Sequence, residues 1–227
     1  MPIQITAQDF YNRLIQSGII NSTGNITFNL NGISMQIDSK DSIGNMLQDW
    51  LGVWSASQNI YLRANPSTQE FPDFYLSNNN DSNFLEIKSF DYNASPNFDI
   101  ANFETYIHSL LVMPKKLDAD YIVFGYTLIN GILTIEEVWL KKIWELTTYS
   151  EQWDLRIQQK KGTIYNIRPV NFKSTNPNIA QPFTSKLDFL NAIQGVLNQY
   201  NKTQLIHNNW LRDFKIIYQI ATGNAPI

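Results

Sequence analysis

The chain has 227 residues, of which 43% are hydrophobic and 13% aromatic, and this composition excludes a disordered chain and indicates a globular protein with a sizeable core. It contains no cysteine, which excludes disulfides, zinc–thiolate sites and cysteine nucleophiles. The formal net charge of −3 argues against a general polyanion binder but leaves open a specific DNA enzyme, because local basic clusters can face the phosphates.

The first predicted elements are a helix and a hairpin. Residues 6–18 place apolar side chains on one helical face, and Gly18 is suited to end the helix. In residues 26–37 apolar and polar side chains alternate on either side of Asn31-Gly32, two residues that tolerate positive φ. The N-terminal part, residues 1–40, is therefore expected to be a helix-hairpin extension of a single domain covering residues 1–227.

A second helix and a second hairpin follow in the chain. An apolar stripe at helical spacing predicts a helix that begins after Asp41 or Ser42 and runs to about Trp54. The next hairpin has arms at residues 71–76 and 84–90, joined by the polar run SNNNDSN.

The second half of the chain continues the alternation of helices and strands. We expect a helix near residues 100–112 and a strand at 118–128 that is buried on both faces. The remaining predicted elements are a strand after the Asn130-Gly131 turn, a short helix at about 142–147, a strand within 162–172, a polar loop at 173–182 and a helical C-terminal part over 174–227. This order predicts an α/β (α+β mixed) fold with a mixed sheet flanked by helices.

The chemically informative segments are PDFYL and LEIKSF, the two arms of the second hairpin. Side chains alternate across a strand, so Glu86 and Lys88 share one face. The other face is expected to hold the apolar side chains of Phe74, Leu76, Leu85 and Ile87. In that register Asp73 joins Glu86 and Lys88, since a slip of one residue would bury the charges.

Two facing carboxylates repel each other unless a cation lies between them, and Mg²⁺ is suited to few carboxylates with water and phosphate oxygens. Lys88 would then orient or deprotonate the attacking water, or neutralise charge in the transition state. The alternative is a surface strand with a Glu-x-Lys ion pair beside an ordinary Pro-Asp turn. The spacing of thirteen residues from Asp73 to Glu86, the apolar frame of both arms and the place of Lys88 among apolar residues favour phosphodiester hydrolysis.

The span from Asp41 to Phe172 resembles the NgoBV-type family of type II restriction endonucleases. The segments that carry the resemblance are DSIGNMLQDWL, TQEFPDFYL, LEIKSF, SPNFDIANF, LDADYIVFGY, VWLKKIWE and GTIYNIRPVNF. The resemblance implies a PD-(D/E)xK core, Mg²⁺ dependence and cleavage of double-stranded DNA at a short palindromic site of the GGNNCC kind, leaving 5′-phosphates. It makes Asp73 and Glu86 metal ligands and Lys88 the catalytic lysine.

Asp49 is a further candidate acid at the edge of the predicted helix's apolar stripe. Nucleases of this class often supply an extra acid from such a helix, and a solvent-facing polar pair with Gln48 is the alternative. The family pattern has Glu where this chain has Asp49.

Candidate DNA contacts lie outside the catalytic hairpin. Arg168 and Asn171 are residue types that read guanine and adenine, and Pro169 predicts that their strand leaves the sheet there. Basic residues that could reach phosphates are Lys115, Lys116, Lys160, Lys161 and Lys173. For each of them the alternative is a solvated surface position, and for Arg168 a structural ion pair.

Taken together, the sequence predicts a cytoplasmic type II restriction endonuclease that acts on double-stranded DNA, with no membrane partner, because no apolar run is long enough to span a bilayer. A palindromic site calls for two-fold symmetry and hence a homodimer. The alternatives are a repair or structure-specific nuclease on the same core and, from another class, a non-catalytic binding module.

Overall fold

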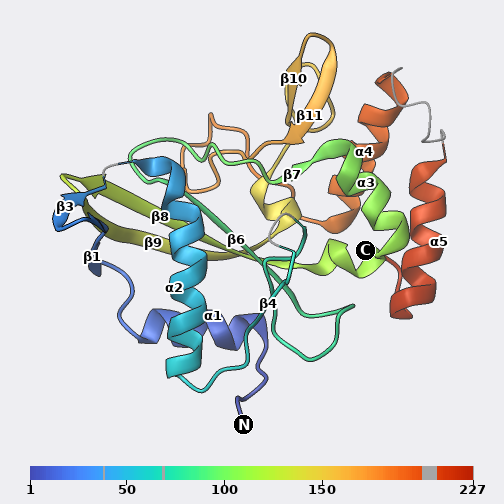
Figure 1. Ribbon diagram of the computed structural model, residues 1–227. Coiled ribbons are helices and arrows are strands. Elements are labelled where there is room, and N and C mark those ends of the chain that lie inside the picture. Colours follow the sequence, from blue (N-terminus) through green and yellow to red (C-terminus); the bar gives the residue numbers. More distant parts are fainter. Residues whose placement is uncertain (38, 68–69, 201–208, 227) are drawn as a thin grey trace. The chain divides into compact units, whose positions relative to one another are not determined.

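A computed structural model describes residues 1–37, 39–67, 70–200 and 209–226 (Figure 1). The chain forms two compact units. Unit 1 comprises Met1–Ser95 and Asp120–Lys141, and unit 2 comprises Pro96–Ala119 and Lys142–Ile227. The prediction that the chain acts as one endonuclease domain with an N-terminal extension and a helical C-terminal part stays a prediction.

Unit 1 is built around a six-stranded sheet. Its strands, in spatial order, are β1 (Thr23–Asn25), β9 (Ile132–Lys142), β8 (Asp120–Ile129), β6 (Phe84–Asp91), β5 (Phe74–Tyr75) and β4 (Arg63–Ala64). The central pair β6 and β8 runs parallel, whereas β1–β9, β5–β6 and β4–β5 pair antiparallel. The predicted mixed sheet is therefore confirmed.

Helices α1 (Ala7–Gln16) and α2 (Ile43–Ser57) cover one face of this sheet (Figure 1). Thr6 caps α1 by accepting a 3.0 Å hydrogen bond from the Asp9 amide, and Gly18 follows the helix at a φ of +77°. Apolar side chains of both helices form one cluster with those of β5, β6, β8 and β9. The opposite face of β6 carries Glu86 and Lys88 between the buried aromatic side chains of Phe84 and Phe90.

The predicted N-terminal hairpin forms a small sheet of its own, with strands β2 (Thr27–Leu30) and β3 (Ile33–Gln36). Asn31 and Gly32 both have positive φ, as a two-residue hairpin turn requires. Phe28 lies opposite Met35, and Leu30 opposite Ile33.

Unit 2 combines helices with a three-stranded sheet. The helices are α3 (Phe103–Val112), α4 (Lys186–Gln199) and α5 (Trp210–Thr222), with short 3₁₀ turns at Pro114–Asp118 and Ile143–Leu146. The sheet has the order β10 (Ile157–Lys160), β11 (Thr163–Ile167) and β7 (Ala101–Asn102). The Trp210 indole donates a 3.1 Å hydrogen bond to the Ile107 carbonyl, which ties α5 to α3.

The sequence did not predict the four short strands β1, β4, β7 and β10, which have two to four residues each. Segments of this length are too short to show an alternating pattern, and their pairing partners are distant in sequence for β1 and β7. None of the helices in the described ranges has the length and apolar character that a membrane span needs.

Candidate active site

The register of the β5–β6 hairpin places the predicted catalytic residues on one face. Phe74 lies opposite Leu85, and Tyr75 opposite Phe84. The four apolar residues expected in the core, Phe74, Leu76, Leu85 and Ile87, are all buried in the cluster under α1 and α2. This register is the predicted one, and it leaves Asp73, Glu86 and Lys88 on the other side of the hairpin.

Backbone and side-chain hydrogen bonds hold Asp73 and Glu86 together. The Asp73 amide donates to Glu86 Oε2 at 3.2 Å, and the Ile87 amide donates to Asp73 Oδ2 at 2.7 Å. Lys88 Nζ donates to Glu86 Oε1 at 3.0 Å. The three side chains thus form one connected set on two paired strands.

The strand that carries Glu86 and Lys88 lies inside the sheet, between β5 and β8. Glu86 pairs with Tyr121 and Lys88 with Val123 in the parallel ladder. The β8 ladder holds the backbone of both residues on one side, and on the other the Ile87 amide between them donates to Asp73, so these side chains start from a rigid base. Such a base is suited to chemistry that depends on precise geometry.

The electrostatics of Asp73 are those of a carboxylate held in unfavourable surroundings. Burial and, to a lesser extent, the nearby Glu86 carboxylate raise the pKa of Asp73 to about 7, against the opposing effects of the Ile87 amide and Lys88. The Glu86 residue is only 9% exposed. Two adjacent carboxylates in such a place are stabilised by a bound cation.

A cavity of about 340 Å³ opens beside Asp73. It is lined by Asp49 of α2, by Asp73 and by Glu70, together with neutral side chains such as Gln48 and Asn65. Asp49 is exposed and lines the same cavity as Asp73. A carboxylate that supports a metal ion at Asp73 would have to lie there. Glu70 was not predicted, and its position three residues before Asp73 was the signal that could have found it.

The donor set suits a hard divalent cation that keeps much of its own water. In the part of the chain that the structure describes, no group of three or more Asp, Glu, His or Cys side chains is arranged to hold a metal. Mg²⁺ characteristically binds through one or two carboxylates, with water and phosphate oxygens completing the coordination. Asp73 and Glu86 fit that pattern.

Comparison with known proteins identifies the family. The model of the NgoBV restriction endonuclease family matches residues 4–226. The chain belongs to this family.

Two relatives of this NgoBV-family chain are named restriction enzymes. The type II restriction enzyme NlaIV of Neisseria lactamica is 36% identical over 220 residues, which cover 96% of this chain and 90% of the relative. The type II restriction enzyme NgoBV of Neisseria gonorrhoeae is 35% identical over 163 residues, 70% of this chain and 93% of the relative. The solved NlaIV restriction endonuclease has a TM-score of 0.92 at 35% identity and covers 99% of this chain and 93% of its own.

These findings confirm the restriction-endonuclease-like fold and the function expected from the sequence. The NgoBV-family chain is a type II restriction endonuclease, a site-specific deoxyribonuclease that acts on double-stranded DNA. Enzymes of this class generally need a divalent metal ion.

In this NgoBV-family enzyme, the residues at the end of β11 that were predicted to contact DNA are partly engaged in contacts within the protein. The Arg168 guanidinium donates to the Asp99 carboxylate and to the Asn97 carbonyl within unit 2. The strand ends at Ile167, as Pro169 predicted, but Val170 is buried, so the chain does not simply turn its side chains outward. Asn171 Oδ1 is buried without a hydrogen-bond partner among the described residues, and Lys173 is half-buried.

The basic pairs differ in their surroundings. Lys116 is buried, with its ammonium 5.3 Å from the centroid of the Tyr106 ring, while Lys115 beside it is half-buried. Lys160 and Lys161 are exposed at the tip of the β10–β11 hairpin, where Lys161 has a φ of +50°. The exposed pair is thus the better placed to reach a phosphate, and the DNA contacts stay predictions.

Proposed function

We propose that this enzyme is a Mg²⁺-dependent restriction endonuclease that cuts both strands of a short palindromic site of the GGNNCC kind and leaves 5′-phosphates. It acts as a homodimer in the cytoplasm, the compartment that holds its substrate. The observation that carries the proposal is the connected set Asp73, Glu86 and Lys88 on one face of the β5–β6 hairpin. The target sequence rests on the family resemblance alone.

The mechanism follows from what each side chain can do. Asp73 and Glu86 hold the metal ion through carboxylate oxygens. When bound, Mg²⁺ supplies Lewis-acid stabilisation of the charge that develops on the phosphate. Lys88 extends from the same face as Glu86 and orients the attacking water or neutralises the developing negative charge. Asp49 supports the metal from α2 across the shared cavity.

DNA affinity comes from basic side chains outside this set. Lys160, Lys161, Lys115 and Lys173 are assigned to phosphates, with a smaller share for the buried Lys116. Arg168 and Asn171 are assigned to base or phosphate contact, and for Arg168 this requires exchange of its bonds to Asp99 and Asn97 for bonds to DNA.

The test is digestion of phage DNA by the purified enzyme with Mg²⁺, followed by sequencing of the fragment ends. We expect discrete fragments whose ends share one palindromic sequence and carry 5′-phosphates. EDTA and a Glu86→Gln variant should each abolish them. Cleavage that follows junctions or lesions rather than a sequence would support a structure-specific nuclease on the same core instead.

A further inference from the structure

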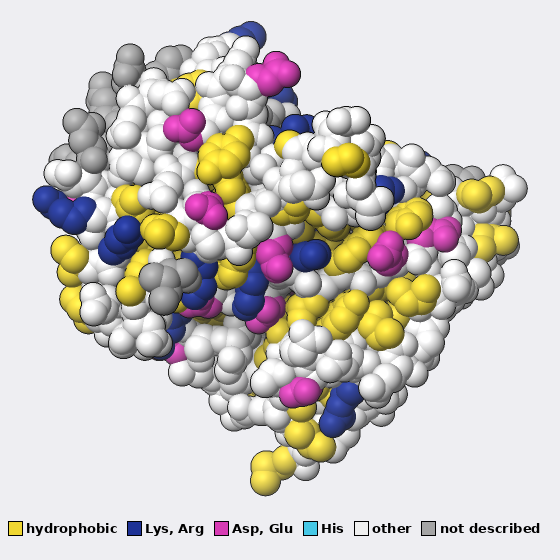
Figure 2. All heavy atoms as spheres, turned by 180° about the vertical axis from the view of Figure 1, so that it is seen from behind, with side chains coloured by type: hydrophobic (Ala, Val, Ile, Leu, Met, Phe, Trp, Pro, Cys, Tyr) yellow, Lys and Arg dark blue, Asp and Glu magenta, His cyan; other side chains and the backbone are white. Residues whose placement is uncertain are grey.

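The β2–β3 hairpin exposes an apolar face. Phe28 is 47% exposed, Leu30 65%, Ile33 73% and Met35 57%. Because Phe28 pairs with Met35 and Leu30 with Ile33, the four side chains lie as two cross-strand pairs on one face of the small sheet. We call these four residues the hairpin face. Figure 2 shows hydrophobic side chains exposed at the end of unit 1 that carries the hairpin.

The hairpin lacks the support that a two-stranded sheet normally needs. All eight residues of β2 and β3 are exposed. An isolated two-stranded hairpin is marginally stable in water and is normally stabilised by packing its apolar face against something else. A large exposed apolar patch on a soluble protein commonly marks an interaction surface.

The charge pattern favours a second copy of this chain as the occupant. No residue from Leu14 to Ile37 carries a charge. A two-fold contact brings each patch against its own copy, so any charge near the axis would meet a like charge. The absence of charge removes this repulsion. It also disfavours DNA as the occupant, because DNA binding draws its affinity from cations on phosphates.

The apolar surface is large enough for a specific dimer. Gly131 lies against Gln36 of β3, and the flanking Ile129 and Ile132 are 62% and 45% exposed. Six large side chains exposed to this degree present on the order of 600 Å² per copy. A specific interface needs about 500 Å² per copy, so the surface meets the requirement.

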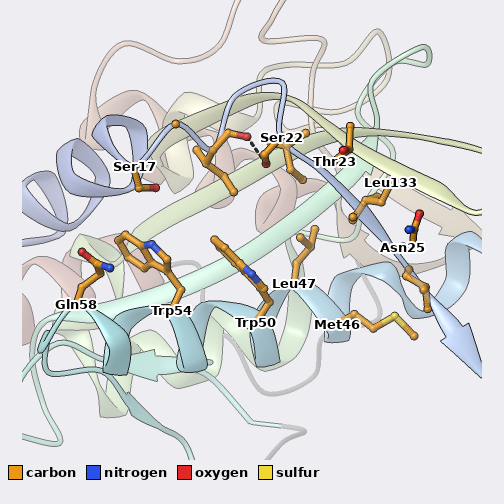
Figure 3. A pocket seen from close by; sticks show the side chains of 15 residues that line it. Ser17, Ser22, Thr23, Asn25, Met46, Leu47, Trp50, Trp54, Gln58 and Leu133 are labelled. Atoms are coloured by element: carbon orange, nitrogen blue, oxygen red, sulfur yellow. Dashed lines mark hydrogen bonds between the residues drawn. The ribbon is translucent and has the colours of Figure 1, made fainter.

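An apolar groove next to the hairpin extends this surface. Asn25 and Ile26, which lead into β2, line a cavity of about 540 Å³ together with Trp50 and Trp54 of α2 (Figure 3). The two indoles are stacked with centroids 6.2 Å apart, and Trp50 is 39% exposed. The rim of the groove therefore offers aromatic surface, and aromatic residues are enriched at protein interfaces.

We infer that the hairpin face is the centre of the homodimer interface. The inference rests on the proposed function, because the palindromic site is what calls for a two-fold dimer. Covering the hairpin by its own copy would also stabilise it. In this arrangement the residues of unit 1 that form the dimer interface differ from those that cleave DNA.

The test compares oligomeric state by analytical ultracentrifugation over a range of protein concentrations. The double variant Leu30→Thr, Ile33→Thr removes apolar surface but keeps residues suited to strands. The matched control Ile216→Thr, Ile220→Thr removes two side chains of α5 that are 53% and 80% exposed. We expect a dimer for the wild type and the control, and at least tenfold weaker dimerisation for the hairpin variant, with circular dichroism unchanged.

A second measurement does not depend on how well that variant folds. The chain has no cysteine, so single Ile33→Cys and Ile220→Cys substitutions give uniquely reactive proteins. A short bismaleimide should join two copies through position 33 and not through position 220. Equal cross-linking at both positions, or a hairpin variant that stays a dimer, would overturn the inference.

The remaining outcomes are also decisive. A monomeric wild type would overturn both the dimer and this surface, while the phage DNA digestion tests the cleavage function independently. A hairpin variant that stays dimeric but loses DNA affinity in Ca²⁺ would show that the hairpin contacts DNA instead.

Discussion

The backbone amide of Asp73 donates a 3.2 Å hydrogen bond to the carboxylate of Glu86, across the antiparallel β5–β6 pair. The Asp73 carboxylate is bonded in turn by the Ile87 amide at 2.7 Å. Each carboxylate is therefore positioned by the strand that carries the other. A change in either strand is expected to disturb both carboxylates together.

The first prediction concerns the stability of the metal-free enzyme. The pKa of Asp73 is raised from 3.8 to about 7 by burial and by Glu86. The folded state therefore keeps a proton that the unfolded chain loses, so stability falls as the pH rises from about 4 to about 7. Asp73→Asn removes this loss and keeps an oxygen to accept from Ile87. In EDTA at pH 8 we expect its melting temperature to exceed that of the wild type by at least about 2 °C.

The pH dependence provides the control for this prediction. At about pH 3.5, below the ordinary Asp pKa of 3.8, Asp73 is largely protonated in the unfolded chain as well as in the folded state, so the two proteins should melt within a degree or so of each other. Saturating Mg²⁺ at pH 8 should stabilise the wild type and not the variant, because only the wild type keeps both carboxylates. If the variant were less stable than the wild type in EDTA at pH 8, the claim that the ionised Asp73 beside Glu86 destabilises the metal-free enzyme would be wrong.

The second prediction separates metal binding from DNA binding. Glu86→Gln keeps the shape of the side chain and removes its charge, so it should lower the cleavage rate more than about 100-fold through lost Lewis-acid stabilisation. Affinity for duplex DNA in Ca²⁺ should stay within about threefold, because phosphate contacts by lysines supply most of it. Gel shift and single-turnover cleavage on the same duplex measure the two effects. If Glu86→Gln kept more than about a tenth of the wild-type rate, Glu86 would not be a metal ligand.

The third prediction concerns Lys88. Its ammonium donates to Glu86 at 3.0 Å, so it could act on the reaction or only organise the carboxylate. If it acts in the chemical step, Lys88→Ala stays inactive at every Mg²⁺ concentration. Titration of Mg²⁺ in single-turnover cleavage distinguishes these roles. Recovery of the normal rate at high Mg²⁺ would mean that Lys88 only organises the metal site.

The sequence predicted the register of the β5–β6 hairpin well because several independent patterns agreed there. The apolar residues Phe74, Leu85 and Ile87 fixed the register, and the register fixed which face Asp73 and Glu86 share. It could not predict that Arg168 is bonded to Asp99, because the two residues are 69 positions apart. Asp49 was a candidate, but only the tertiary packing of α2 brings it to the cavity that Asp73 lines.

The fourth prediction concerns the packing on the face of the sheet that carries Phe90. The Trp139 ring stacks on Phe90 and on Tyr92, with centroids 5.7 and 6.3 Å away. A Cβ atom at Gly125 would lie 2.8 Å from Tyr92 and 3.0 Å from Trp139. Gly125→Ala should therefore destabilise the enzyme by about 1–3 kcal/mol, as overpacking typically does.

Gly52 offers a matched control for that substitution. It lies within α2, and a Cβ atom there would meet nothing within 4 Å. Gly52→Ala should be neutral or stabilise by up to about 1 kcal/mol, because alanine is the better helix former. Urea unfolding of the two variants measures both effects. Equal stabilities would show that Tyr92 and Trp139 move aside without cost.

The last prediction concerns Arg168, for which reading DNA and holding unit 2 together are alternatives. Its guanidinium donates to Asp99 and to the Asn97 carbonyl, both in the segment that leads into β7 and α3. The Arg168 side chain is 25% exposed and that of Asp99 53%, so solvent weakens the ion pair and the bond to the carbonyl contributes a larger share. A structural role predicts that Arg168→Ala loses about 1–2 kcal/mol of stability. Asp99→Asn should then lose less, because it keeps an acceptor for the guanidinium.

A role in reading guanine makes a different prediction. Arg168→Ala should then weaken cognate binding by about 1–3 kcal/mol and relax the preference at one base pair. Asp99→Asn should free the arginine and bind DNA at least as well as the wild type. Melting curves of both variants, with titration of cognate and single-substituted duplexes in Ca²⁺ at two salt concentrations, distinguish these roles. Unchanged stability together with unchanged affinity for every duplex would exclude both.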